Sequence, residues 1–222
     1  MVKTQKITVN TLDALVASIL AFRQNQNKVL RHSAEILEEG QLDNKQLISK
    51  FFADGKLVPA NLIEEAENIR SSLNQRVMMN TLTGAKTGDF LMEVNSILQN
   101  ESVSGNKFGL VAWAPKLFAD TLKSDNVREE ILSLSIGSTY QGTVGKRLEV
   151  TFNLINCTFL QSYSSYVHNG HDGNGNLISF WKSERVADSV KLVGRIKAHR
   201  NEARYSNAKF TVLSHVKVVD EK

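Results

Sequence analysis

Cysteine, proline and long apolar stretches are scarce in this chain of 222 residues, and each shortage excludes a class of structure. Cys157 is the single cysteine, so the chain cannot form an intrachain disulfide or a zinc site that needs several thiolates. The 2 prolines argue against long polyproline or disordered stretches. The apolar segment 12–22 contains Asp13 and is too short to span a bilayer. We therefore expect a cytoplasmic protein, in the host cytoplasm if the chain is viral, with no membrane partner.

Motifs that would indicate an enzyme or a cofactor are also lacking. Gly145-Lys146 is without the preceding glycine and the following hydroxyl residue of a phosphate-binding loop. The loop that begins at Asp172 lacks the glycine and the glutamate that a calcium loop carries at its sixth and twelfth positions. His168 and His171 have no third histidine or cysteine in their loop to complete a metal site. We predict that the protein is not an enzyme and has no cofactor and no metal.

Positive charge is concentrated in the C-terminal part of the chain. The net charge is only +4, but residues 140–222 carry 12 Lys+Arg and 7 Asp+Glu, whereas residues 1–139 carry 15 and 16. From residue 185 to residue 217 the chain has 8 basic residues and 2 acidic ones. This distribution is expected if one face of the C-terminal region meets a polyanion.

The N-terminal part follows the spacing of helices. Apolar residues recur at helical intervals in five segments, residues 11–20, 27–39, 44–54, 59–77 and 90–98. Residues 108–122 also have helical spacing, but Pro115 either breaks or starts a helix there. Asp125 is then predicted to cap a further short helix. We therefore predict a helical domain over residues 1–136.

The pattern changes after this domain. Residues 137–145 are rich in glycine and threonine and are interpreted as the junction or as a first edge strand. Residues 147–166 are β-branched and aromatic and predict one long, bent strand, and the turn-rich residues 168–176 predict a hairpin connection. Further strands are predicted at 177–182, 190–199 and 209–219. The chain is therefore expected to be α+β, with a small antiparallel barrel or sandwich over residues 137–222.

Basic and aromatic residues are interleaved in this β region. Apolar and basic residues alternate along 190–199, which is typical of a strand with one face in solvent. A solvated face is the plain interpretation of that pattern. Single-stranded nucleic acid, however, is held by basic contacts to its backbone and by base stacking worth about 1–3 kcal/mol per base. The predicted nucleic-acid-binding residues are Tyr163, Tyr166, Trp181, Lys182, Arg185, Lys191, Arg195, Lys197, His199, Arg200 and Arg204.

These residues are given separate roles. The predicted phosphate contacts are Arg195, Lys197 and Arg200, and the predicted stacking residues are Tyr163, Tyr166 and Trp181. A solvated surface and a packed core remain alternative interpretations of the basic and aromatic residues.

The C-terminal run resembles a known fold. A strand ending in Phe180-Trp181, the strand 193–199 and the last strand 211–218 are similar to those of small OB-fold barrels, including bacteriophage replication and single-strand-binding proteins. The resemblance covers residues 146–220. It implies an OB-like barrel with a groove across its second and third strands, flanked by the first loop, that binds single strands. The groove residues that it implies are Tyr163, Tyr166, Lys182, Arg195, Lys197 and His199.

One feature of the chain departs from that fold. Residues 200–209 leave no room for the helix that many OB-folds carry between the third and fourth strands. A barrel of five strands would then draw on residues 139–144 for the missing strand.

We predict a non-catalytic protein that binds single-stranded nucleic acid, DNA in the first place and RNA as the alternative. It would act as an accessory factor in bacteriophage replication, recombination or transcription. The helical domain would recruit a replication or transcription protein or form a homo-oligomer. Two other hypotheses stay open: an inhibitor or assembly protein that docks through its β domain, and an enzyme such as a nuclease with an unrecognised site in its helical half.

Overall fold

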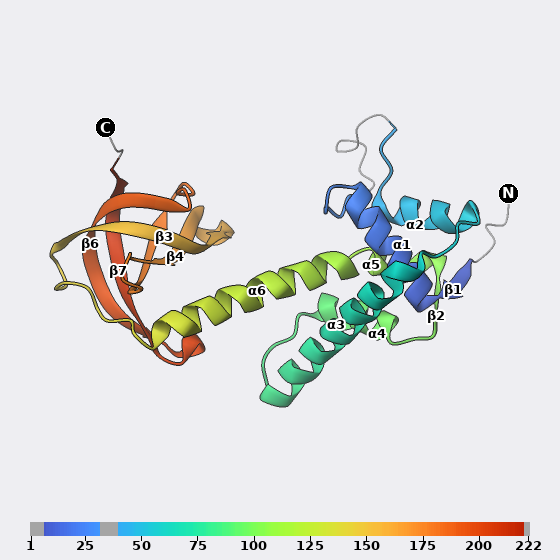
Figure 1. Ribbon diagram of the computed structural model, residues 1–222, viewed down its shortest axis with the longest axis horizontal. Helices are drawn as coiled ribbons and strands as arrows, with labels where there is room; N and C mark the ends of the chain where they lie inside the picture. The colour runs from blue at the N-terminus through green and yellow to red at the C-terminus, as the bar shows by residue number, and fades with distance from the viewer. Residues whose placement is uncertain (1–6, 32–39, 220–222) are drawn as a thin grey trace. The chain divides into compact units, whose positions relative to one another are not determined.

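The computed structural model describes residues 7–31 and 40–219 (Figure 1). Helices occupy the N-terminal half and a β-barrel occupies the C-terminal half, which confirms the predicted α+β class. The chain divides into two compact units, residues 1–122 and 123–222. No helix among the described residues has both the length and the apolar character needed to cross a lipid bilayer.

The first unit is built from helices and one small sheet. The helices are α1 (Thr11–Gln24), α2 (Asn44–Ala53), η1 (Ala60–Leu62), α3 (Ile63–Thr83), α4 (Asp89–Leu98), η2 (Gly105–Lys107), α5 (Phe108–Val111) and the start of α6 (Ala114–Ser135). Strands β1 (Thr8–Asn10) and β2 (Ser102–Ser104) pair antiparallel. The core forms around α1, where Ala14, Leu15 and Val16 are fully buried.

Two helix predictions differ from the structure. Gln26 and Asn27 have positive φ angles that end α1, and the described part of the predicted helix 27–39 is not helical. Residues 32–39 of that prediction lie outside the described residues. Asp125 caps no short helix, because α6 runs through it to Ser135. Pro115 lies in the first turn of α6, where its missing N–H is not needed.

The second unit is a closed barrel of five strands, β3 (Arg147–Leu160), β4 (Ser165–His171), β5 (Leu177–Lys182), β6 (Ser189–Glu202) and β7 (Ala208–Val218). Their order around the barrel is β3-β4-β5-β7-β6, which is compatible with an OB-like fold. The prediction that all strands are antiparallel was wrong, because β5 and β7 pair in parallel. A ring with an odd number of strands cannot alternate direction all the way round, so one neighbouring pair must be parallel.

The additional strand does not come from residues 139–144, which form none. It comes from the predicted long strand 147–166, which divides into β3 and β4. A short 3-10 turn, η3 (Gln161–Tyr163), follows β3, and Ser164 then reverses the chain with a φ of 44°. Leu160 and Ser165 face each other across the resulting hairpin.

The barrel interior is apolar and tightly filled. Phe152 and Phe180 meet edge to face within it, with 5.0 Å between their ring centroids. Gly170 on β4 lies directly against β3, where a Cβ atom would stand 2.1 Å from the carbonyl oxygen of Asn153. Any other residue at this position would push the two strands apart.

The last turns of α6 cover part of the barrel from outside. Ile131 is fully buried there, in a cluster with Leu177 of β5 and with Ala208 and Phe210 of β7. The β6–β7 connection contains only the short turn η4 (Ala203–Tyr205). The helix that packs on this barrel therefore precedes the strands in sequence.

Candidate functional site

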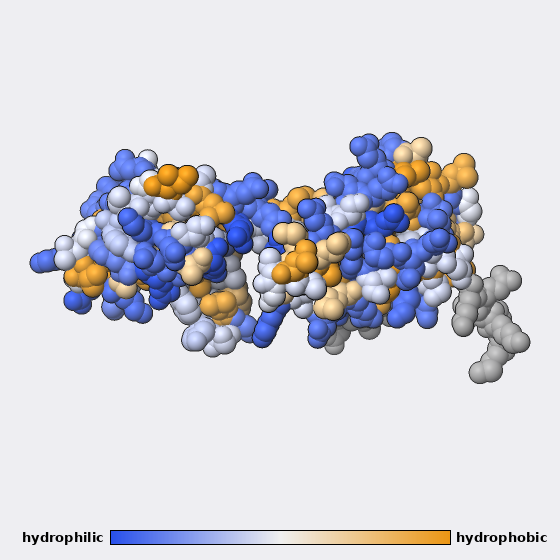
Figure 2. All heavy atoms as spheres, turned by 90° about the horizontal axis from the view of Figure 1, so that it is seen from below, coloured by the Kyte–Doolittle hydropathy of each residue, from blue (hydrophilic) through white to orange (hydrophobic). Residues whose placement is uncertain are grey.

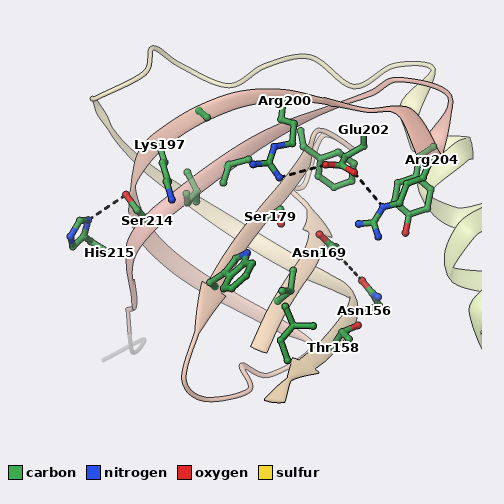
Figure 3. A pocket seen from close by; sticks show the side chains of 18 residues that line it. Asn156, Thr158, Asn169, Ser179, Lys197, Arg200, Glu202, Arg204, Ser214 and His215 are labelled. Atoms are coloured by element: carbon green, nitrogen blue, oxygen red, sulfur yellow. Dashed lines mark hydrogen bonds and ion pairs between the residues drawn. The ribbon is translucent and has the colours of Figure 1, made fainter. Parts of the chain in front are cut away.

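A groove of about 660 Å³ lies on the outer face of the barrel (Figure 3). Its floor is formed by side chains from β3, β4 and β5, and its far wall by the long hairpin of β6 and β7. Trp181 pairs with Val167 and Ser179 pairs with Asn169, so these four side chains share one face of the sheet. The alternate residue Phe180 points into the barrel core. The groove is therefore open to solvent and separate from the interior.

Two aromatic rings lie at one end of the groove. Trp181, which lines it, is 49% exposed, and Tyr163 in the β3–β4 turn is 65% exposed. The rings meet edge to face at a centroid distance of 5.1 Å. In an edge-to-face pair only one face of one ring is covered by the other ring, so this contact leaves other ring faces free for a planar ligand to stack on.

Three cations stand on the wall of the groove. Lys197 and Arg200 extend from β6, and Arg204 extends from the β6–β7 turn. The guanidinium of Arg204 lies 4.7 Å above the ring of Tyr205. Figure 3 shows the carboxylate of Glu202 between the two arginines, to which it is ion-paired. Three cations face one carboxylate, so the groove favours an anionic ligand.

A bulge in β6 sets the direction of Lys197 and Arg200. The pairing of β6 with β7 shifts between Ile196 and Ala198, which leaves Lys197 as an extra residue. An extra residue inverts the alternation of side chains beyond it. Arg200 consequently faces the groove, whereas His199 turns the other way and stacks on Tyr140 at 4.5 Å. The single alternating basic face predicted for residues 190–199 is thus divided in two.

The structure brings four of the eleven predicted binding residues together in the groove. They are Trp181, Lys197, Arg200 and Arg204. Tyr163 contacts Trp181 beside it. The other six lie outside the groove lining, namely Tyr166, Lys182, Arg185, Lys191, Arg195 and His199.

Strand alternation and local pairing explain these exclusions. Tyr166 and Lys182 pair with each other on the opposite face of the sheet from Trp181. Lys182, Arg185 and Lys191 form ion pairs with Glu184, Asp188 and Glu149, respectively. Arg195 donates from Nε to the carbonyl oxygen of Gly145 at 3.0 Å.

The polar part of the groove floor was missed by the sequence analysis. Asn169 Nδ2 donates to Asn156 Oδ1 at 3.0 Å, and Thr158 and Ser179 lie on the same floor (Figure 3). These residues come from three strands and carry no local motif. Their proximity follows only from the pairing of β3 with β4 and of β4 with β5.

The barrel also contains a histidine and a cysteine that are neighbours across β3 and β4. His168 is fully buried, stacks on Phe180 at 4.7 Å and accepts a hydrogen bond from the backbone N–H of Val186 at 3.3 Å. Burial lowers the pKa of His168, and burial raises the pKa of the Cys157 thiol. A nucleophilic cysteine needs the opposite shift, so these pKa directions do not favour a Cys157–His168 nucleophile.

Among residues 7–31 and 40–219, no group of three or more His, Cys, Asp or Glu side chains could hold a metal ion. Asp172, which opens the rejected calcium loop, is engaged within its own turn. Its Oδ1 accepts from the backbone N–H groups of Asn174 and Asn176, both at 2.8 Å. This carboxylate holds the β4–β5 connection in shape.

In comparisons with known proteins, no family model, curated protein or solved structure matches this chain. The function is therefore argued from the chemistry of the groove. An exposed aromatic floor beside a cationic wall can hold a ligand that is planar in one part and anionic in another.

Proposed function

We propose that the barrel is an OB-type fold whose groove binds single-stranded nucleic acid without catalysing a reaction on it. The observation that carries the proposal is the placement of Trp181 on the floor and of Lys197, Arg200 and Arg204 on the wall. An unpaired base would stack on the indole while the phosphates follow the cations. Bases inside a duplex are already stacked on each other and cannot reach such a ring.

The wider role that we propose rests on the resemblance to bacteriophage replication and single-strand-binding proteins. The protein would be an accessory factor that holds single-stranded DNA, and its helical unit would contact a partner protein or a second copy. Apolar side chains are exposed at the end of α3, and Figure 2 shows apolar surface on this unit. Such a surface supports a contact role for the unit. The exposed side chains include Met78, Met79 and Leu82.

The test compares two sets of three alanine substitutions in the full chain. One set replaces the groove cations Lys197, Arg200 and Arg204. The control set replaces Lys191, Arg195 and Lys217, which are exposed barrel residues that do not line the groove. Both sets remove the same charge, so a difference between them reports on the groove itself.

We expect the groove set to weaken binding of a labelled strand of about 16 nucleotides by about tenfold or more. The plot of log K against log salt should become less steep by about 2, since each phosphate contact on a single strand contributes about 0.7. The control set should bind almost as the unchanged protein does. Equal losses in both sets, measured by fluorescence anisotropy, would contradict the proposed groove. If the protein instead docks on other proteins through its β domain, neither the unchanged protein nor either variant set should show salt-dependent binding of the labelled strand.

A further inference from the structure

Glu202 is the one carboxylate among the described residues that line the groove, and it is ion-paired with two of the cations that an anionic ligand would contact. We infer that Glu202 is a competing anion, which occupies the two groove arginines and holds the affinity for single strands below what those arginines would otherwise give. This inference rests on the proposed function and adds a residue that regulates the same site.

The geometry of the three charges supports competition. One carboxylate oxygen of Glu202 lies 3.6 Å from Nη1 of Arg200, and the other lies 3.3 Å from Nε of Arg204. The side chain of Glu202 is 24% exposed, whereas those of the two arginines are 63% and 61% exposed. The carboxylate thus lies on the sheltered side of the arginines, and their outer sides face solvent. A phosphate approaching from solvent would meet guanidinium groups whose charge is already partly neutralised.

Glu202 is not needed to hold the arginines in place. The guanidinium of Arg204 rests on the ring of Tyr205, and that ring packs toward Phe210 and the cluster around Ile131. The backbone of Arg200 is held in β6, where it pairs with Phe210 of β7. Ion pairs between side chains this exposed contribute little to order. Removing the carboxylate should therefore free the arginines without displacing them.

Replacing Glu202 by glutamine tests this role directly, because the amide keeps the shape of the side chain and removes its charge. Repulsion between a carboxylate and a phosphate several ångströms away, near a protein surface, corresponds to about a three- to tenfold change in affinity. We expect Glu202→Gln to bind single strands tighter by that factor. Its plot of log K against log salt should also be steeper, by about 0.7, since one more cation is free to release a counterion.

A matched control lies elsewhere on the same barrel. Glu149 of β3 is exposed, is ion-paired with Lys191 at 2.9 Å, and does not line the groove. Glu149→Gln makes the same change in net charge and also breaks an ion pair. We expect the affinity of Glu149→Gln to stay within about twofold of that of the unchanged protein, because the charge of Glu149 is exposed, lies outside the groove lining and is screened by salt.

The experiment is fluorescence anisotropy of the full chain with labelled oligothymidine of about 16 nucleotides, between about 50 and 200 mM salt. Tighter binding by Glu202→Gln, with Glu149→Gln unchanged, supports the inference, and Glu202→Ala should reproduce it. If the unchanged protein binds but Glu202→Gln binds equally or more weakly, Glu202 does not compete with the ligand, and the inference is overturned while the proposed function stands. If neither protein binds at the lowest salt, the proposed function fails and the inference fails with it.

Discussion

At the residue scale, His168 is an uncharged base held in an apolar interior. Its ring stacks on Phe180 and takes a hydrogen bond from the backbone of Val186. Burial is the main cause that lowers its pKa. The positive charges of Lys182 and Arg185 lower it further. His168 therefore resists protonation in the folded barrel.

The pKa of His168 is lower in the folded barrel than in the unfolded chain, and this difference makes the stability of the barrel depend on pH. Because the pKa of His168 is lower in the folded barrel, the unfolded chain binds a proton there more readily as the pH falls below about 6.5, so protonation favours unfolding. We expect the free energy of unfolding to fall as the pH drops from about 7.5 toward 5. His168→Gln should flatten this dependence, as measured by urea unfolding at each pH. The control is His215→Asn. His215 is exposed and has a positive φ, which asparagine tolerates, so this variant should keep the full pH dependence.

Trp181 shows what sequence can and cannot say about a single residue. Its ring was predicted to stack on a base because basic residues surround it in the sequence. Its place in the groove depends on a pairing with Val167 that no local pattern contains. Tyr166 had the same local appearance, yet alternation along β4 puts it on the other face of the sheet.

At the element scale, the order of the helices and strands was largely predictable, and their ends were not. The turn after Leu160 was missed because Gln161 and Ser162 interrupt the β-like composition only briefly. The bulge at Lys197 was missed because an extra residue in a strand leaves no mark on composition. That bulge matters most for the site, since it decides which side of β6 faces the groove.

Helix α6 is the element whose contribution to the barrel is easiest to measure. Ile131 is fully buried against Leu177, Ala208 and Phe210. We expect Ile131→Ala to destabilise the barrel by about 2–5 kcal/mol, because it leaves a cavity between helix and strands, and Ile131→Val to cost about 0.5–1.5 kcal/mol. Urea unfolding followed through the fluorescence of Trp181, with Trp113→Phe in every form compared, measures both. A loss below about 0.5 kcal/mol for the alanine variant would mean that α6 does not stabilise the barrel.

At the scale of the whole molecule, the positive charge of the sequence lies in the C-terminal region, but only some of its basic residues line the groove. Residues 140–222 hold the excess of basic residues, but ion pairs on the outer barrel engage several of them. The cations of the groove are those that the β6 bulge and the β6–β7 turn direct to one side. A count of charges therefore indicated the region that we propose as the binding region, and the register of the strands determines which of its basic residues line the groove.

The most direct test of the central claim uses Trp181 as its own reporter. The chain has 2 tryptophans, so Trp113→Phe leaves Trp181 as the single indole. We expect its fluorescence to be quenched when a single strand is added, because a base stacks on the ring, and to change little with duplex of the same length. The quenching should weaken between about 50 and 200 mM salt. Fluorescence that does not change on adding single strands at the lowest salt would contradict binding in this groove.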